Sequence, residues 1–210
     1  MIKADVKAVG AIKRNATFKT DKKGQDYLSL IMSVLITDQK EGEKEVEIVV
    51  TYPNGKKGDV KQFSGSKHVA ASGVMDIRKK GEDLVFYLTA SELEVVGKDE
   101  ADDISGTLHF RGHMKKKNIY EEKEARNGNH YLTYPAYSSE KVGDNFVSTW
   151  VNFIQFPGSG AGIDSIKTDC LAPKAHVSIE GDFKLEAYNK RLRIMSQVQE
   201  ISLYTPDGQK

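Results

Sequence analysis

Cysteine is nearly absent from this chain of 210 residues, which contains only Cys170. A single cysteine cannot form an intrachain disulfide, so the sequence predicts a protein of a reducing compartment such as the cytoplasm. Long apolar runs are lacking too. No stretch approaches the roughly 18 apolar residues of a membrane span, and the first residues, MIKAD, do not resemble the start of a signal peptide. We therefore expect no association with a membrane.

An excess of charge of one sign is also missing. Lys and Arg number 31 and Asp and Glu number 30, so the formal net charge is +1, and neither half of the chain is basic. Binding to nucleic acid would therefore need a local basic patch. The acidic residues form no acid–base or two-metal pattern, and no cysteine lies near His109 and His113 to complete a zinc site. The sequence predicts a protein that is not an enzyme, with no metal and no cofactor.

The two halves of the chain repeat each other in order and spacing. The stretches that align are GQDYLSL (24–30) with GNHYLTY (128–134), VEIVVTYPNG (46–55) with WVNFIQFPGS (150–159), KHVAASGVMDI (67–77) with AHVSIEGDFKL (175–185), LVFYLTASELEVV (84–96) with LRIMSQVQEISLY (192–204) and, loosely, VKAVGAIKRN (6–15) with TLHFRGHMKKKN (107–118). Matches in register over nearly the full length predict a duplicated domain. We expect one domain over 1–98 and another over 104–206, separated by the polar segment 95–103.

In this alignment Trp150 takes the place of Val46, and Phe156 that of Tyr52. His176 takes the place of His68, and this recurrence favours a structural role for both histidines.

Each copy is typical of a small β-barrel. Alternating apolar residues at Leu28, Leu30 and Met32 predict a strand, and two β-rich runs, 69–77 and 84–96, are joined by the turn sequence RKKGED. A short helix is expected near 58–66 in the first copy, where the second has a glycine-rich connector. Strand, strand, strand, connector and hairpin is the strand order of an OB-fold. The sequence therefore predicts an all-β protein with two tandem five-stranded OB-fold barrels joined by short helix or loop connectors.

Four stretches of the second copy carry a family resemblance: LHFRGHM, GNHYLTYPAYS, TWVNFIQFPG and VSIEGDFKLEAY. With these motifs the second copy resembles a domain of the bacterial single-stranded DNA-binding proteins. The resemblance implies that Trp150, Phe156 and Tyr188 stack on bases. The first copy follows the same framework without this aromatic signature, and Pro157 departs from the family pattern, in which glycine follows the phenylalanine directly.

The resemblance also bears on assembly. The family combines four OB domains, so two per chain imply a homodimer. Its members usually end in a tail with an acidic tip that recruits other proteins, whereas this chain ends in TPDGQK after the last predicted strand. We therefore expect no recruitment through such a tail, and a location with DNA in the cytoplasm of a bacterium or of a phage-infected host.

The residues themselves indicate where a strand would bind. If Leu28, Leu30 and Met32 face the core, Tyr27 faces outward, and so does Tyr131 in the second copy. Outward rings stack on bases and nearby cations follow phosphates. The predicted binding residues are the aromatics Trp150, Phe156, Tyr188, Phe146, Tyr131, Tyr27 and Tyr52, and the cations Arg111, Lys115, Lys116, Lys117, Arg126, Arg191, Arg193, Lys13 and Arg14.

The function predicted from these observations is binding of single-stranded DNA without sequence preference, in replication, recombination or repair. Two alternatives stay open at this point. The rings could instead be buried at an interface, in which case the protein is an assembly module, or the barrels could bind RNA.

Overall fold

The computed structural model describes residues 1–38, 42–189 and 191–205. The chain divides into two compact units, one made of 3–106 with 185–192 and the other of 1–2, 107–184 and the chain from 193 onward. The domain boundaries expected above stay a prediction, and residue 206, the end of the second one, lies outside the described residues. No helix in the described ranges is long and apolar enough to cross a membrane.

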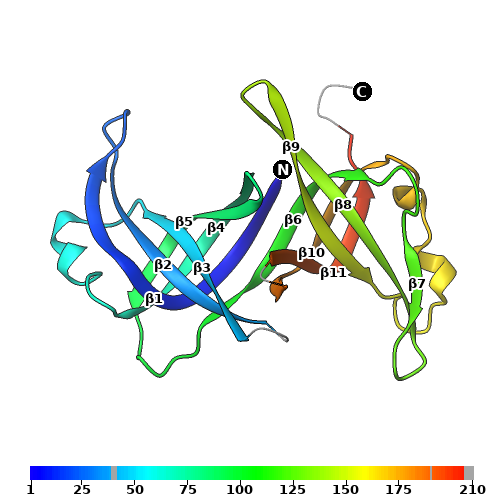
Figure 1. Cartoon of the computed structure of the whole chain (residues 1–210), viewed down its shortest axis with the longest axis horizontal. Coiled ribbons are helices and arrows are strands. Elements are labelled where there is room, and N and C mark those ends of the chain that lie inside the picture. The colour runs from blue at the N-terminus through cyan, green and yellow to red at the C-terminus, as the bar shows by residue number, and fades with distance from the viewer. Residues whose placement is uncertain (39–41, 190, 206–210) are drawn as a thin grey trace. The chain divides into compact units, whose positions relative to one another are not determined.

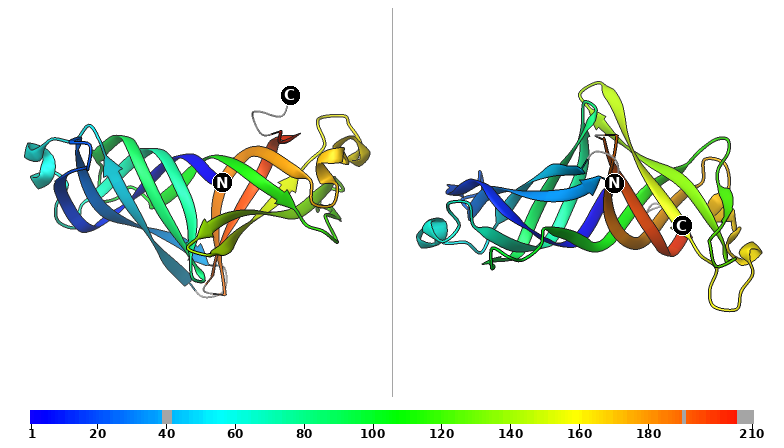
Figure 2. Two further views of the ribbon diagram at one scale, coloured as in Figure 1. Left: turned by 90° about the horizontal axis from the view of Figure 1, so that it is seen from above. Right: turned by 60° about the horizontal axis from the view of Figure 1, so that its bottom comes forward.

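The N-terminal barrel has five strands that close on themselves (Figures 1 and 2). They are β1 (Ile2–Thr20), β2 (Asp26–Asp38), β3 (Gly42–Tyr52), β4 (His68–Lys80) and β5 (Asp83–Val95), with the 3-10 helix η1 (Lys57–Lys61) before β4. The long, curved β1 pairs with β4 through Lys3–Ala11 and with β2 through Ala11–Thr20. The remaining contacts run β2–β3–β5–β4, with β3 and β5 parallel. This closed order is that of an OB-fold.

The C-terminal barrel repeats the order with one addition. Its elements are β6 (Asp103–Met114), β7 (Glu121–Glu124), β8 (His130–Val142), β9 (Asn145–Gln155), η2 (Ile163–Ile166), η3 (Asp169–Leu171), β10 (His176–Tyr188) and β11 (Arg191–Leu203). Neighbours run β6–β8–β9–β11–β10 and back to β6, with β9 and β11 parallel, and the short β7 adds to the edge of β8. Two OB-fold barrels with short connectors are therefore confirmed. The connector helix expected near 58–66 is the 3-10 turn η1.

Alternation along the strands fills the core of each barrel. On β2 the side chains of Leu28, Leu30 and Met32 are buried, as predicted from their spacing. The C-terminal core is more aromatic: the ring of Phe153 lies 5.2 Å from that of Phe110 and 5.7 Å from that of Tyr134.

The hydroxyl of buried Tyr134 donates a hydrogen bond of 2.8 Å to the side-chain oxygen of Gln155, so this polar group has a partner inside the core. Burial raises the pKa of the Tyr134 hydroxyl.

The repeat alignment is wrong by one residue in the third strand. Leu28 pairs with Tyr52 on β3, whereas its counterpart Leu132 pairs with Gln155 on β9. Tyr52 therefore corresponds to Gln155, and the offset that relates β2 to β8 does not relate β3 to β9. One residue is enough to exchange the faces of a strand, because side chains alternate with a period of two.

The corrected register changes the partner of the tryptophan. Trp150 corresponds to Glu47, which is exposed, and not to Val46, which is buried at 2% exposure. Phe156 and Tyr52 are therefore not equivalent. Tyr52 is separated from buried Val46 by an even number of positions, so it lies on the inward side of β3, where it is half-buried. The alignment with Phe156 was the reason for placing Tyr52 in the binding surface, and that reason is removed.

A glycine in the first strand of each barrel lets the second strand approach closely. A Cβ built on Gly10 would collide with the backbone carbonyl of Ser33, and one built on Gly112 with the carbonyl of Tyr137. Any other residue would push the two backbones apart where the barrel closes. The shared contact establishes Ser33 and Tyr137 as equivalent positions.

We expect Gly112→Ala to lower the free energy of unfolding by about 1–3 kcal/mol, because the added methyl group overpacks a site bounded by backbone. The control is Gly158→Ala, where no atom lies within 4 Å of the added Cβ. Urea denaturation of both variants checks the prediction. Equal stability of the two variants would contradict it.

Candidate nucleic-acid interface

Four aromatic rings lie on the outer face of β8 and β9. Trp150 is 46% exposed and pairs directly with Tyr137, with ring centroids 5.0 Å apart. Phe156, directly after β9, is 41% exposed, and its ring lies 5.1 Å from that of Tyr131. Outward strand parity brings these rings to one face, because Val151 and Phe153 take the inward positions between them.

Between the two ring pairs, the outward positions of β8 and β9 themselves carry no charge. These positions are Thr133 opposite Ile154 and Pro135 opposite Asn152. On the neighbouring β7, Glu121 pairs with Thr133 and Lys123 with Tyr131. Six residues of extended strand separate Trp150 from Phe156, or ~20 Å. The face is therefore long enough for several bases, with flat rings at both ends.

A further ring stands free near the β8–β9 turn. Phe146, at the start of β9, is 74% exposed and pairs across the hairpin with Lys141. A benzyl group with so little packing contributes little to the core, and it is accessible to a ligand.

The predicted cations of the C-terminal unit lie at exposed or half-exposed positions. Arg111, on the outer face of β6, holds its guanidinium carbon 4.9 Å from the ring centre of Tyr204. The lysines 115–117 lie in the segment between β6 and β7. The backbone carbonyl of Lys115 accepts a hydrogen bond of 3.2 Å from the backbone N–H of Lys174. The others in this unit are Lys115, Lys116, Lys117, Arg126 and Arg193.

The remaining predicted residues belong to the other unit. Tyr188, half-buried at the end of β10, and exposed Arg191 lie in its segment 185–192. Tyr27 is half-buried on the outer side of β2, as expected. The other predicted residues of this unit are Tyr52, Lys13 and Arg14.

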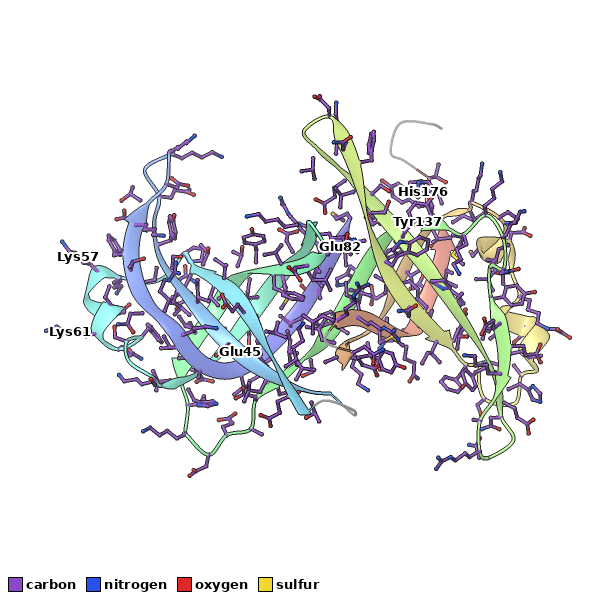
Figure 3. All side chains as sticks on the ribbon, viewed as in Figure 1. Glu45, Lys57, Lys61, Glu82, Tyr137 and His176 are labelled. Carbon is purple, nitrogen blue, oxygen red and sulfur yellow. The ribbon has the colours of Figure 1, made fainter. Side chains whose placement is uncertain are left out.

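On the N-terminal barrel, the strand that corresponds to β9 is acidic on its outer face. Glu43, Glu45 and Glu47 alternate there with inward residues (Glu45 is labelled in Figure 3). The ammonium of Lys13 lies 2.7 Å from Glu45 and 2.8 Å from Glu47, and these hydrogen bonds, that of Glu45 first, raise the pKa of Lys13. Lys13 is thus held by carboxylates that would repel phosphate.

Sequence reasoning missed several rings beside Trp150. The ring of Tyr137 lies 5.9 Å from that of His113, which stacks at 4.3 Å on His176. His176 in turn lies 4.6 Å from Tyr204 (Tyr137 and His176 are labelled in Figure 3). These residues come from separate strands, so no local spacing in the sequence could have shown that they meet.

The two recurring histidines have different surroundings. His68 Nε2 lies 2.7 Å from the carboxylate of Asp102, which also accepts a hydrogen bond from the backbone of Leu35. His176 instead stacks on an imidazole. Burial, then repulsion from His113 and from the terminal amino group, lowers the pKa of His176 below its ordinary 6.5.

A cavity of about 530 Å³ opens beside Phe156. Pro157 and the glycine-rich residues that follow form one wall, and Asn129 and His130 lie in the lining as well. Pro157, which departs from the family pattern, therefore shapes the edge of the aromatic face. The glycine-rich connector lines a concave surface, which its sequence did not indicate.

No protein-family model matches the sequence, and no curated protein matches it significantly. Solved structures do match. The wild-type single-stranded DNA binding protein from Thermus aquaticus is 10% identical over 96% of this chain and 93% of its own, with a TM-score of 0.47. The mitochondrial single-stranded DNA binding protein Rim1 from S. cerevisiae is 19% identical over 47% of this chain and 93% of its own, with a TM-score of 0.36. The priB protein from Ralstonia solanacearum is 14% identical over 47% and 97%, with a TM-score of 0.32.

Two of these three are single-stranded DNA binding proteins by name. Likenesses at such identities and TM-scores carry no argument about residues or ligands. The OB-fold is defined here by the strand order of each barrel, and the candidate interface by its exposed rings.

We expect stability to fall as the pH is lowered through about 6.5, in part because of His176. Its pKa is lower in the folded than in the unfolded chain, so the unfolded chain binds more protons in this range. Urea midpoints at pH 5.5 and 7.5 should differ less for His176→Gln than for the wild type. A control is His109→Gln, which removes an imidazole 3.3 Å from Glu180. An NMR titration midpoint of His176 at or above 6.5 would contradict the prediction.

Proposed function

We propose that the C-terminal barrel binds single-stranded DNA on the outer face of β8 and β9, by stacking bases on the ring pairs Trp150–Tyr137 and Tyr131–Phe156. The observation that carries the proposal is that Trp150 and Phe156 are exposed on one face of the sheet, with uncharged outward positions of β8 and β9 between them. Each stacked base contributes ~1–3 kcal/mol whatever its identity. Binding is therefore expected to be tight without sequence preference.

The N-terminal barrel supports the proposal as an internal comparison. It has the same strand order, yet Glu47 stands where the C-terminal barrel has Trp150. A carboxylate at this position is as compatible with the barrel as an indole, so the fold does not require a ring there. The ring at Trp150 is explained by a ligand with flat faces.

The two barrels differ in the charge of their outer surfaces. Arg111 and the Lys115–Lys117 run lie exposed or half-exposed on the unit that carries the rings, where they would neutralise phosphates and release counterions. The outer face of β3 is acidic and would repel the same phosphates. We therefore infer that the corresponding face of the N-terminal barrel takes no part in binding DNA.

Such a protein would cover and protect exposed strands in replication, recombination or repair, with no catalysis of its own. This role would place it with DNA in the cytoplasm.

We also propose a homodimer with four OB barrels. Light scattering on the purified chain tests this point, and a monomer at micromolar concentration would contradict it.

Intrinsic fluorescence provides the main test, because Trp150 is the sole tryptophan. Titration with poly-dT should quench the emission, and the affinity should fall as salt is raised. Trp150→Ala, followed by anisotropy of labelled oligo-dT, should weaken binding by ~1–3 kcal/mol, or about fivefold to 150-fold.

The matched control is Tyr87→Ala, which removes a ring of similar exposure, 43%, from β5. It should leave the affinity unchanged. If poly-dT neither quenches Trp150 nor shifts the protein in a gel, DNA binding is excluded and an assembly module is favoured. Tighter binding of oligo-U than of oligo-dT would instead identify an RNA-binding protein.

A further inference from the structure

The rings beside Trp150 form a transverse row on the C-terminal barrel. Cross-strand pairing places Trp150 opposite Tyr137 on β8, and Tyr137 opposite His113 on β6. His113 stacks on His176, the first residue of β10, at 4.3 Å and an interplanar angle of 21°. The row ends at Tyr204, whose backbone N–H donates a hydrogen bond of 2.8 Å to the carbonyl of His176.

The row is continuous across the strands. Its ring centroids follow one another at 5.0, 5.9, 4.3 and 4.6 Å. These are contact distances for aromatic pairs. The four residues beyond Trp150 are half-buried, so each is partly accessible to solvent.

The N-terminal barrel has the same row of positions with different residues. Glu47 pairs with Ser33, Ser33 with Ala11, and Ala11 with His68. The backbone of Val96 donates to the carbonyl of His68 at 3.0 Å, as Tyr204 does to His176. An identical framework is thus stable with small, acidic and aliphatic side chains. The aromatic row is a property of the C-terminal surface alone.

Cations border the row on both sides. Arg111, two positions before His113 on β6, lies on the same side of the strand and ~7 Å away. Lys115 follows directly after the end of β6 and is half-buried. Lys174, two positions before His176, is exposed. Among charged and titratable groups, His113 and the terminal amino group act on His176, and Glu140 and Arg111 act in turn on the terminal amino group. Arg193 of β11 is the neighbour of Trp150 in the parallel register of β11 and β9.

We propose that this row is a second arm of the single-stranded DNA site. A strand that leaves Trp150 crosses β8, β6 and β10, with bases against Tyr137, the imidazoles and Tyr204 and phosphates beside Arg111 and Lys115. The proposal rests on the proposed function, since the arm continues from Trp150. DNA is favoured as the occupant because a row of flat rings with cations beside it suits a polymer of bases and phosphates.

The two imidazoles give this arm a distinctive property. A phosphate beside His113 and His176 favours their protonated forms, so binding takes up protons. Affinity for DNA should therefore rise as the pH falls from 8 to 6. Stacking of bases on Trp150 and Phe156 has no such dependence.

The test is a double variant, His113→Ala with Tyr204→Val, in the full chain. The new residues are those that the N-terminal barrel has at the equivalent positions, Ala11 for His113 and Val96 for Tyr204. The same strand pairing is therefore compatible with them. Affinity for poly-dT, read from quenching of Trp150, should fall about fivefold to 150-fold at pH 6, and the rise between pH 8 and 6 should be reduced. Thermal unfolding checks that the variant is folded.

Two further variants separate ring from charge. His113→Phe keeps a stacking ring but removes an imidazole. It should retain the affinity for DNA at pH 8 and show a smaller increase in affinity between pH 8 and pH 6. His109→Gln removes an imidazole from the same strand, four positions or ~13 Å from His113. This variant should change neither the affinity for DNA at pH 8 nor its increase at pH 6.

The outcomes distinguish this inference from the proposed function. If poly-dT quenches Trp150 in the wild type and the double variant binds with the same affinity and the same pH dependence, the transverse arm is overturned and the β8–β9 site stands. If the double variant alters the oligomeric state and not the affinity, the row is an interface between copies, and the arm is again overturned. Absence of quenching in the wild type overturns the proposed function itself.

Discussion

Closure of each barrel depends on one close approach between backbones. At Gly10 and at Gly112, the carbonyl of the neighbouring strand occupies the space that a Cβ would need. This contact lets the first strand bend and pair on both sides, so that five strands form a closed order. The inward and outward positions of every other strand follow from this closure, because alternation then assigns each side chain to core or solvent.

The same framework carries two different surfaces. In the N-terminal barrel the row across the strands consists of Glu47, Ser33, Ala11 and His68. The imidazole of His68 is hydrogen-bonded to the carboxylate of Asp102. In the C-terminal barrel, the equivalent row consists of rings in contact. Since the backbone pairing is the same in the two barrels, the difference lies in the side chains that each surface presents.

Electrostatics reinforces this division. Lys13, which the sequence placed with the phosphate-binding cations, is hydrogen-bonded to Glu45 and Glu47. Such an exposed network contributes little to stability, since water screens it. The outer face of β3 is thus acidic, whereas the outward positions of β8 and β9 between the ring pairs are neutral, and Arg111 and the lysines 115–117 of the C-terminal unit are exposed or half-exposed.

The sequence by itself determined the β class, the duplication and the strand order, because period-two alternation and turn residues act over a few positions and repeat in both halves. It also indicated Trp150 and Phe156 as surface rings. It did not reveal the one-residue shift in the third strand, which paired Trp150 with Val46 in the alignment and with Glu47 in the structure. Only the tertiary structure decided that Tyr137, His113, His176 and Tyr204 continue from Trp150, because their contacts depend on the register between strands far apart in the chain, and no local pattern encodes that register.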